Sequence, residues 1–297
     1  MEKRMTTDTS ATDNILEIKN LTKQYPGFLL DSISLSIPKG SIMGLIGENG
    51  AGKSTTIKSA LGLIRKDGGT ITFWGQELAE ARQLKEDIGV VFDSVNFYET
   101  LTPAKTGNVL AASYKQWNSG QYKNYLERFK LPADEEIKTF SKGMKTKLCI
   151  AAALSHAPKL LILDEATSGL DPVMRNDILD VFLEFVQDEE HSILMSSHIS
   201  TDLEKVADYI AFIHKGKLLF CKTKDELRYR YGIMRCRTEE FHNMDKSDIL
   251  AYRKEDYQWN VLVADKERAK RKYKAAVIDN ATIDDILLLY VKGEQIK

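Results

Sequence analysis

Eight consecutive residues follow a pattern that is typical of sites for nucleotide phosphates. They are Gly47, Glu48, Asn49, Gly50, Ala51, Gly52, Lys53 and Ser54, and Thr55 follows them. The pattern G-x-x-x-x-G-K-[S/T] puts glycines where backbone N–H groups must approach phosphate oxygens, and a lysine that reaches the β- and γ-phosphates. Its last position supplies a hydroxyl ligand for Mg²⁺. The segment therefore predicts a site for a nucleoside triphosphate and Mg²⁺.

The residues on either side of this loop favour the same interpretation. Residues 42–46 form an apolar run of strand length, and residues 55–64 have helical spacing with Ile57, Leu61 and Ile64 on one face. A strand, a glycine-rich loop and a helix in this order would add the positive end of the helix to the phosphate site. An ordinary glycine-rich turn would not need all four fixed positions and both flanks.

A second group of residues could supply the metal and proton chemistry. The apolar run 160–163 ends in Asp164 and Glu165, as expected for a central strand buried on both faces. Asp164 is then placed to hold Mg²⁺, and Glu165 to accept a proton from water that attacks the γ-phosphate. Acidic residues at a strand end also serve as helix caps or surface groups, but the phosphate loop favours the catalytic interpretation.

These residues need an α/β framework around them. We expect a P-loop NTPase core of the RecA-like type, with an antiparallel β subdomain, a helical subdomain insertion and a small α+β C-terminal domain. Antiparallel strands are predicted at 15–25 and 29–37, further strands at 70–74, 88–92 and 193–197, an amphipathic helix through 178–185, and a hairpin at 209–214 and 217–221.

The domain boundaries follow from changes in this pattern. We expect a flexible N-terminus at 1–14, a nucleotide-binding domain at 15–222 with its helical subdomain at about 93–157, and an accessory domain at 223–297. A helical stripe near the end runs through Ile283, Ile286 and Tyr290, with Thr282 as its N-cap. The basic stretch 266–274 is typical of a solvated helix face, and a lipid-facing role stays open.

Composition excludes several classes of protein. At 297 residues, with 43% hydrophobic and 29% charged residues, the chain has the composition of an ordinary globular protein. A formal net charge of −1 argues against bulk binding of nucleic acid. The three cysteines, Cys149, Cys221 and Cys236, have no metal-type spacing and suggest a reducing compartment. No apolar run has the length of a membrane span, so membrane work would need another chain.

Five motifs in one order carry a resemblance to a known family. The stretch 164–172 resembles the joined Walker B motif and D-loop of ATP-binding cassette (ABC) ATPases, and it follows the phosphate loop. Residues 140–144 stand where that family has its L-S-G-G-Q signature. His198 matches the switch histidine, and Tyr25 matches the aromatic residue that stacks on adenine. The resemblance covers about residues 15–221.

The resemblance implies roles for particular residues. It implies ATP as the nucleotide, with Lys53, Glu165 and His198 as catalytic residues. It also implies that two such domains close head to tail, so that Ser141, Gly143 and Met144 of one subunit meet the ATP bound by the other. It also implies that Asp171 of the D-loop contributes to nucleotide binding. Simpler interpretations remain: Tyr25 as a packed strand aromatic, His198 as a surface histidine, and Asp171 as a turn residue before Pro172.

Two segments depart from the family's pattern. In the signature, Lys142 replaces a glycine and Met144 replaces glutamine, while Ser141 and Gly143 remain. Lys142 would either add positive charge near the γ-phosphate or face solvent. Asp93 stands at the position of the family's Q-loop glutamine. A carboxylate there can bind Mg²⁺ directly, but it cannot donate an amide hydrogen bond to water.

The function implied is that of an ATP-hydrolysing subunit of an ABC transporter. The signature and the Asp93 loop resemble those of bacterial type-2 exporters of antibiotics, lantibiotics or amphipathic peptides, including phenol-soluble modulins. The implied partners are an integral membrane subunit and a second ATPase subunit, with no nucleic acid, at the cytoplasmic face of the plasma membrane. Alternatives are an importer subunit, a soluble ABC ATPase acting on DNA or ribosomes, and a GTPase or small-molecule kinase.

Overall fold

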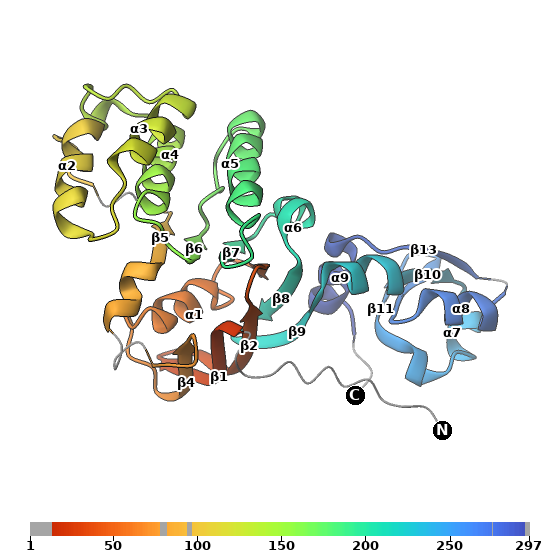
Figure 1. Cartoon of the computed structure of the whole chain (residues 1–297). Coiled ribbons are helices and arrows are strands. Elements are labelled where there is room, and N and C mark those ends of the chain that lie inside the picture. The colour runs from red at the N-terminus through yellow and green to blue at the C-terminus, as the bar shows by residue number, and fades with distance from the viewer. Residues whose placement is uncertain (1–13, 78–81, 94–96, 275, 295–297) are drawn as a thin grey trace. The chain divides into compact units, whose positions relative to one another are not determined.

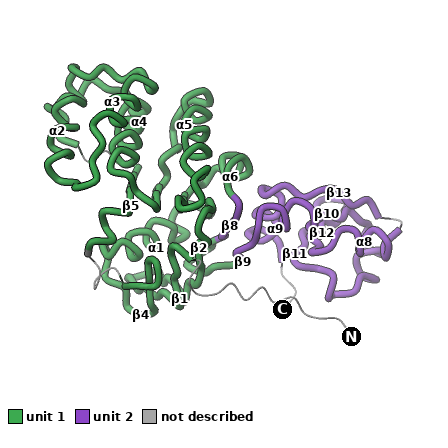
Figure 2. Tube along the Cα trace, in the orientation of Figure 1, with its two compact units in different colours: residues 1–207, 213–219 green, residues 208–212, 220–297 purple. Residues whose placement is uncertain are grey.

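A computed structural model describes residues 14–77, 82–93, 97–274 and 276–294 (Figure 1). The chain divides into two compact units, residues 1–207 with 213–219 and residues 208–212 with 220–297 (Figure 2). The predicted flexible segment 1–14 lies outside the described residues, except for Asn14, which begins the first strand.

The phosphate loop belongs to a six-stranded sheet with the order β5-β6-β7-β3-β8-β9. Its strands are β3 (Ile42–Ile46), β5 (Ile88–Phe92), β6 (Leu160–Asp164), β7 (Ser192–Ser197), β8 (Tyr209–His214) and β9 (Lys217–Thr223). Every residue of β3, β6 and β7 is buried, which explains why β3 and β6 consist of nearly continuous apolar runs.

The register of this sheet brings the ends of three strands together. β3, β6 and β7 run parallel, with Ile46 beside Ser197 and Asp164 beside Ser196. The residues that follow these strands, which are the phosphate loop, Glu165 and His198, therefore meet at one edge. Ligands of open α/β sheets bind at this carboxyl edge.

The first unit also contains the predicted antiparallel β subdomain. It consists of β1 (Asn14–Tyr25), β2 (Phe28–Pro38) and β4 (Gly68–Phe73), in the order β2-β1-β4. Both neighbours of β1 pair with it in antiparallel fashion. The prediction of antiparallel strands at 15–25 and 29–37 is confirmed to within one residue at each end.

Helices surround the sheet and form the predicted insertion. α1 (Lys53–Ala60), α5 (Pro172–Phe185) and α6 (Ser200–Val206) follow β3, β6 and β7, and the short helix η1 (Arg82–Asp87) precedes β5. The insertion holds α2 (Pro103–Ser113), α3 (Ser119–Arg128), η2 (Ile137–Thr139) and α4 (Lys142–Leu154). The prediction of a helix reaching Ile64 is wrong: α1 ends at Ala60 because Gly62 adopts a left-handed conformation with a φ of 68°.

The second unit has its own antiparallel sheet, with the order β11-β12-β10-β13. The strands are β10 (Gly232–Cys236), β11 (Ile249–Glu255), β12 (Gln258–Val263) and β13 (Val277–Asn280), and the helices are η3 (Glu226–Arg230), α7 (Thr238–His242), η4 (Lys246–Asp248), α8 (Lys266–Lys272) and α9 (Ile283–Lys292). Thr282 caps α9 as predicted, because its Oγ1 accepts a hydrogen bond of 3.1 Å from the Asp285 N–H. The predicted α+β character of this part is confirmed.

The basic stretch 266–274 lies mainly on α8, where acidic neighbours compensate part of its charge. Asp248 lies 2.6 Å from the Lys272 ammonium and 3.2 Å from the Arg268 guanidinium. Burial alone would raise the pKa of Asp248, but hydrogen bonds from Lys272 and Tyr273 outweigh it and lower this pKa. These contacts favour the interpretation of a solvated, ion-paired helix. Within the described ranges, no helix combines the length and apolarity that crossing a bilayer requires.

Candidate functional site

The phosphate loop has a backbone that only glycine tolerates at key positions. A Cβ atom at Gly47 would lie 2.3 Å from the carbonyl oxygen of Ile213. Gly52 has a φ of 118° and forms the N-cap of α1. The loop therefore passes directly against neighbouring backbone and ends at the start of a helix, where free N–H groups and the helix dipole favour an anion.

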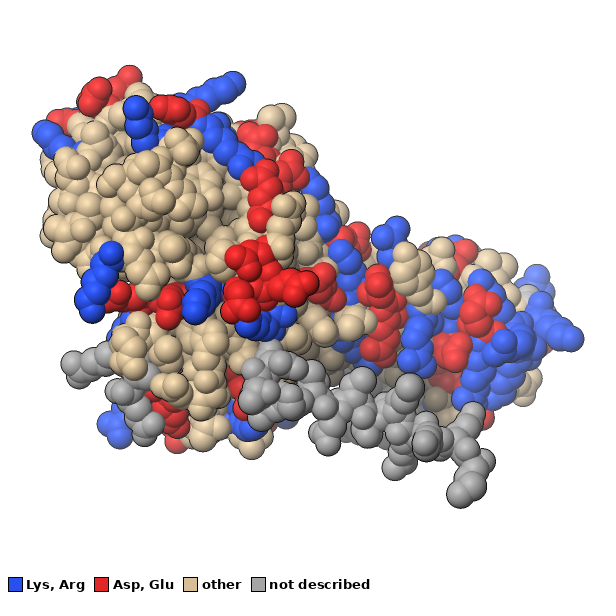
Figure 3. Space-filling view, in the orientation of Figure 1, with Lys and Arg blue, Asp and Glu red and all other residues tan. Residues whose placement is uncertain are grey.

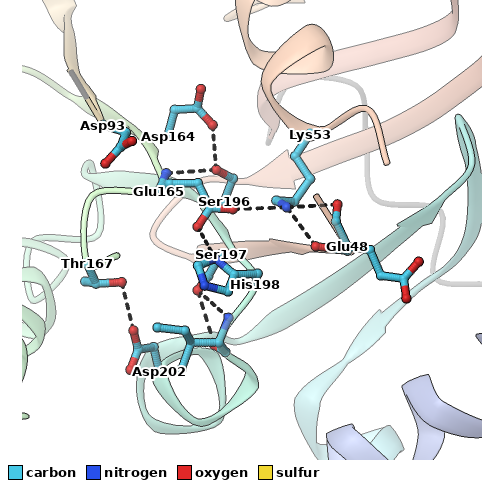
Figure 4. Close-up of polar contacts among 12 residues, drawn as sticks. Glu48, Lys53, Asp93, Asp164, Glu165, Thr167, Ser196, Ser197, His198 and Asp202 are labelled. Atoms are coloured by element: carbon cyan, nitrogen blue, oxygen red, sulfur yellow. Dashed lines mark hydrogen bonds and ion pairs between the residues drawn. The ribbon is translucent and has the colours of Figure 1, made fainter. Parts of the chain in front are cut away.

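Lys53 is held inside this loop. Its residue is only 5% exposed. The ammonium donates to the carbonyl oxygens of Gly47 at 2.7 Å and Glu48 at 3.3 Å, and lies 3.0 Å from Oε1 of Glu165. A buried ammonium with these partners is a fixed positive charge at the bottom of the loop, as Figure 4 shows.

Asp164 lies at the end of β6 and contacts two hydroxyl groups. Ser54 Oγ donates to its Oδ1 at 3.0 Å, and Ser196 Oγ donates to the same oxygen at 2.8 Å. Asp164 is 6% exposed. The structure thus brings together Ser54 and Asp164, two of the three residues that the sequence analysis assigned to Mg²⁺.

Glu165 stands between two possible partners in the reaction. Its Oε1 faces Lys53, and its Oε2 lies 2.6 Å from Nδ1 of His198 (Figure 4). Its backbone has a φ of 56°, in the left-handed region that non-glycine residues seldom occupy. The Glu165 N–H donates to Ser196 Oγ at 3.0 Å. Three predicted catalytic residues, Lys53, Glu165 and His198, therefore form one contiguous polar group.

A pocket of about 420 Å³ opens beside this group. It is lined by Phe28, Glu48, Asn49, Gly50, Gly52, Lys53, Ser54, Thr55 and Glu165. Seven of the predicted nucleotide-contacting residues between positions 48 and 55 lie in or beside this wall, with Ala51 buried behind it at 4% exposure. The pocket offers backbone N–H groups, an ammonium and a hydroxyl at one end and an aromatic ring among its walls.

The aromatic residue of the pocket is Phe28, which the sequence analysis missed. Tyr25, the predicted adenine partner, is 38% exposed, and the Lys23 ammonium lies 5.4 Å from its ring centre. Tyr25 pairs directly with Phe28 across the turn at Pro26 and Gly27. An aromatic residue at each side of one tight turn was the available signal for Phe28, while the role of Tyr25 stays a prediction.

The signature segment forms the start of α4. Ser141 is its N-cap, and the Met144 N–H donates to Ser141 Oγ at 3.2 Å. Gly143 is closely packed against α5, since a Cβ atom there would lie 2.7 Å from Sδ of Met174. Ser141 is an exposed residue at a helix N-terminus, so its hydroxyl and the first N–H groups of α4 can meet an anion from outside the chain.

Lys142 and Asp93, two of the three positions that depart from the family's pattern, contact each other. The Lys142 ammonium lies 2.7 Å from Oδ1 of Asp93, and both side chains are more than half exposed. Asp93 therefore joins the end of β5 to the start of α4. The prediction that Asp93 binds Mg²⁺ must allow for this pairing, because the carboxylate already has a cationic partner.

Asp171 also has a partner within the chain. It is the N-cap of α5, and its Oδ1 accepts hydrogen bonds of 3.0 Å from the N–H groups of Val173 and Met174. This explains an aspartate directly before Pro172 without any ligand. Its predicted part in nucleotide binding stays a prediction.

The oxygen atoms of this site suit a Mg²⁺ ion that takes most of its ligands from the nucleotide and water. Ser54 and Asp164 provide hydroxyl and carboxylate oxygens, which are the ligands that this hard cation prefers. No group of three or more His, Cys, Asp or Glu side chains within the described part of the chain could enclose a metal ion. This pattern matches Mg²⁺ sites in which one or two protein oxygens are completed by phosphates and water.

Comparison with known proteins decides the family. The model of the family described as ABC transporter matches residues 30–168. The chain is 37% identical over 214 residues to the lantibiotic transport ATP-binding protein SrtF of Streptococcus pyogenes, covering 71% of this chain and 92% of that protein. The chain belongs to the ABC transporter ATP-binding proteins. It is an ABC transporter ATPase.

Other relatives and solved structures agree with this membership. The ABC ATPase is 35% identical over 209 residues to the bacitracin transport ATP-binding protein BcrA of Enterococcus faecalis, covering 69% of this chain and 68% of that one. It is 35% identical over 229 residues to the linearmycin resistance ATP-binding protein LnrL of Bacillus subtilis (strain 168), covering 73% and 72%. A solved ATP-binding subunit of an ABC transporter matches with 30% identity and a TM-score of 0.64, covering 72% and 92%.

Family membership establishes the coarse function of the site. As an ABC transporter ATPase, the chain binds ATP, and such subunits work with membrane subunits in transporter complexes. The predicted P-loop fold with a parallel sheet and antiparallel subdomains is confirmed. The alternatives of a GTPase, a small-molecule kinase and a soluble ATPase acting on DNA or ribosomes are thereby set aside.

Proposed function

We propose that this ABC ATPase hydrolyses Mg²⁺-bound ATP to power the export of a peptide, an antibiotic or a similar amphipathic substrate through a separate membrane subunit. The observation that carries the hydrolytic part is the position of Glu165, between the buried Lys53 ammonium and His198. The export part is supported by the names of the relatives, which refer to lantibiotic transport, bacitracin transport and linearmycin resistance.

The nucleotide would enter the pocket with its phosphates on the loop and its base beside Phe28, with Tyr25 nearby across the hairpin turn. Lys53 would then turn from Glu165 to the β- and γ-phosphates, because their charge exceeds that of one carboxylate. This exchange frees Glu165 Oε1 to accept a proton from water. Bound Mg²⁺, held by Ser54 and Asp164, would supply charge stabilisation at the phosphate oxygens.

His198 would complete this arrangement from the opposite side of Glu165. Its Nδ1 lies 2.6 Å from Glu165 Oε2, so the imidazole fixes the direction of the carboxylate. The exposed side chain of His198 can also meet the γ-phosphate or the water. Glu165 thus acts as the base, Lys53 as the fixed cation, and His198 as the group that orients the base and senses phosphate.

A second copy or a paralogue would complete the site. Ser141 and Gly143, with Met144 and Asp171 beside them, are proposed to meet the γ-phosphate bound by the other subunit. The exposed position of Ser141 at the N-terminus of α4 supports this, because the first N–H groups and the dipole of a helix attract an anion. ATP would then bridge the two subunits, and hydrolysis would remove the bridging phosphate.

The membrane subunit is proposed to bind at the helical subdomain, at the cytoplasmic face of the plasma membrane. A small, largely apolar pocket of about 170 Å³ lies there, between residues of β5, α2 and α4. Its walls are Ile88, Val90, Val91, Phe92, Phe97, Leu110, Tyr114, Cys149, Ala152, Ala153 and His156. Figure 3 shows a broad area without charged side chains over this part of the molecule.

The hydrolytic proposal is tested by Glu165→Gln. The variant should bind ATP, lose turnover by a factor of at least about 100, and accumulate an ATP-bound dimer, because the amide cannot accept the proton. Glu190→Gln is the control, since Glu190 is exposed and forms an ion pair with Lys39. Turnover of Glu165→Gln close to that of the parent would remove Glu165 from the mechanism.

The export proposal needs the membrane partner. We expect a multi-span membrane protein to be encoded beside this chain and to co-purify with it. The complex in proteoliposomes should hydrolyse ATP faster with amphipathic peptides than with small polar solutes. Substrate moving inward toward the ATPase side would instead support an importer.

A further inference from the structure

Ser196 occupies a central place in the polar group, although no motif names it. It lies on β7, is fully buried, and is paired in register with Asp164 of the neighbouring strand. Its hydroxyl donates to Asp164 Oδ1 at 2.8 Å and accepts from the Glu165 N–H at 3.0 Å (Figure 4). One hydroxyl thus contacts two consecutive residues with different proposed roles.

The contact with Asp164 fixes the direction of a carboxylate. In the present structure Ser54 and Ser196 both donate to Oδ1 of Asp164. When the Ser54 oxygen turns to Mg²⁺, the Ser196 hydroxyl remains to orient this carboxylate. Hydrogen bonds from outer partners of this kind set the orientation and the basicity of metal ligands.

The contact with Glu165 holds an unusual backbone conformation. The Glu165 N–H donates to both the hydroxyl and the carbonyl oxygen of Ser196, at 3.0 and 3.3 Å. With a φ of 56°, Glu165 lies in a region that persists only where the surroundings determine it. This backbone conformation directs the Glu165 carboxylate toward Lys53 and His198.

We propose that Ser196 is a positioning residue of the ATPase site, which orients the Mg²⁺ carboxylate of Asp164 and the base Glu165 through a single buried hydroxyl. This inference rests on the proposed roles of those two carboxylates. It predicts that loss of the hydroxyl weakens the use of Mg²⁺ as well as turnover, and not only the stability of the fold.

Ser192 offers a matched control on the same strand. It is equally buried, and its Oγ accepts from the Gly40 N–H at 3.0 Å and donates to the Pro38 carbonyl oxygen at 3.4 Å. Ser192→Ala therefore also removes from β7 a buried hydroxyl that makes two hydrogen bonds. Ser192 lies at the opposite end of β7 from Ser196, which pairs with Asp164.

The experiment measures ATP retention against Mg²⁺ concentration in the Glu165→Gln background, where turnover does not interfere. Adding Ser196→Ala should raise the half-saturating Mg²⁺ concentration about tenfold, as removal of outer partners of metal ligands typically does. Adding Ser192→Ala should leave it unchanged. In the parent background, Ser196→Ala should also lower kcat at least about tenfold, while Ser192→Ala should keep it.

A second variant covers the case in which Ser196→Ala folds poorly. Ser196→Cys keeps a side chain of similar size with a weaker donor, so it should shift the Mg²⁺ midpoint in the same direction by a smaller factor. Midpoints within twofold of the parent, or equal shifts for the Ser196 and Ser192 variants, would overturn the proposal. Failure of Glu165→Gln alone to retain ATP would contradict the proposed roles of the carboxylates instead.

Discussion

The phosphate loop and the start of α4 are both assigned to ATP, but only the phosphate loop has most of its side-chain contacts within this chain. Around the phosphate loop, Lys53 and Asp164 are buried and have several partners each. At the start of α4, Ser141 is exposed, and the Lys142–Asp93 ion pair lies open to solvent. The difference fits our proposal that the chain alone builds a binding site for ATP, while the signature end meets the ATP of a second subunit.

Lys53→Ala should have the largest effect on ATP binding, because it removes the buried ammonium of the phosphate loop. ATP affinity should fall at least about 100-fold, which corresponds to about 2.7 kcal/mol. Loss of the ammonium also removes the donor to the carbonyl oxygens of Gly47 and Glu48 and the cationic partner of the Glu165 carboxylate. Nucleotide binding by calorimetry measures the effect.

Lys147→Ala is the matched control for that change. Lys147 is also buried, at 7% exposure, and its ammonium lies 3.5 Å from Asp177, away from the pocket. This variant should lose stability and keep its ATP affinity. Equal losses of ATP affinity in both variants would show that the loss comes from a damaged fold and not from the missing contact with phosphate.

Ser141→Ala should separate the two regions. The single chain should bind ATP as the parent does, while turnover should fall about tenfold or more because the partner's phosphate loses a donor. The lost cap should also cost about 1 kcal/mol of unfolding free energy. Thr102→Ala removes a comparable cap, that of α2, and should cost similar stability with normal turnover. Unchanged turnover in Ser141→Ala would remove the signature end from the site.

The aromatic side of the pocket predicts a smaller effect. Phe28→Ala should raise the KM for ATP about five- to tenfold, as expected when a base loses a stacking partner worth about 1 kcal/mol. Tyr25→Ala should change KM less than twofold, because Tyr25 is absent from the pocket wall. The reverse ranking in steady-state kinetics would support Tyr25, and not Phe28, as the residue that stacks on adenine.

The Lys142–Asp93 pair should give the smallest effect on stability. Both side chains are exposed, so their attraction contributes no more than about 1 kcal/mol. Asp93→Lys should lower turnover severalfold by repelling Lys142, and the double charge reversal with Lys142→Asp should restore part of it. The similarly exposed pair Lys39–Glu190 is the control. Additive effects of the two reversals would show that the pair does not act as a unit.

The sequence predicted the parts of this account that depend on local pattern. The strand 88–92 and the cap of α9 by Thr282 agree with the structure, because apolar runs and capping residues act over a few positions. The end of α1 was misjudged because apolar spacing continued past Gly62, where the backbone reverses. Contacts across many residues were not predictable, as the pairing of Asp93 with Lys142 and the two bonds of Ser196 show.

The same distinction applies within the site. Lys53, Ser54, Asp164 and Glu165 could be named from spacing, and His198 from the resemblance to the family; the structure brings them together. Phe28 was missed although an aromatic residue stands at each side of the Pro26-Gly27 turn, and Ser196 belongs to no recognisable spacing. Their roles follow only from the hairpin register and from the pairing of β6 with β7.

The most direct test of the central claim is ATP-dependent crosslinking between two differently tagged copies in the Glu165→Gln background. One copy carries Asn49→Cys in the phosphate loop, and the other carries Met144→Cys in the signature segment. We expect a crosslink between the copies that forms with ATP and Mg²⁺ and not without them. A crosslink that forms equally well without nucleotide would contradict a site shared by two subunits. The absence of any crosslink between copies that bind ATP would contradict it too.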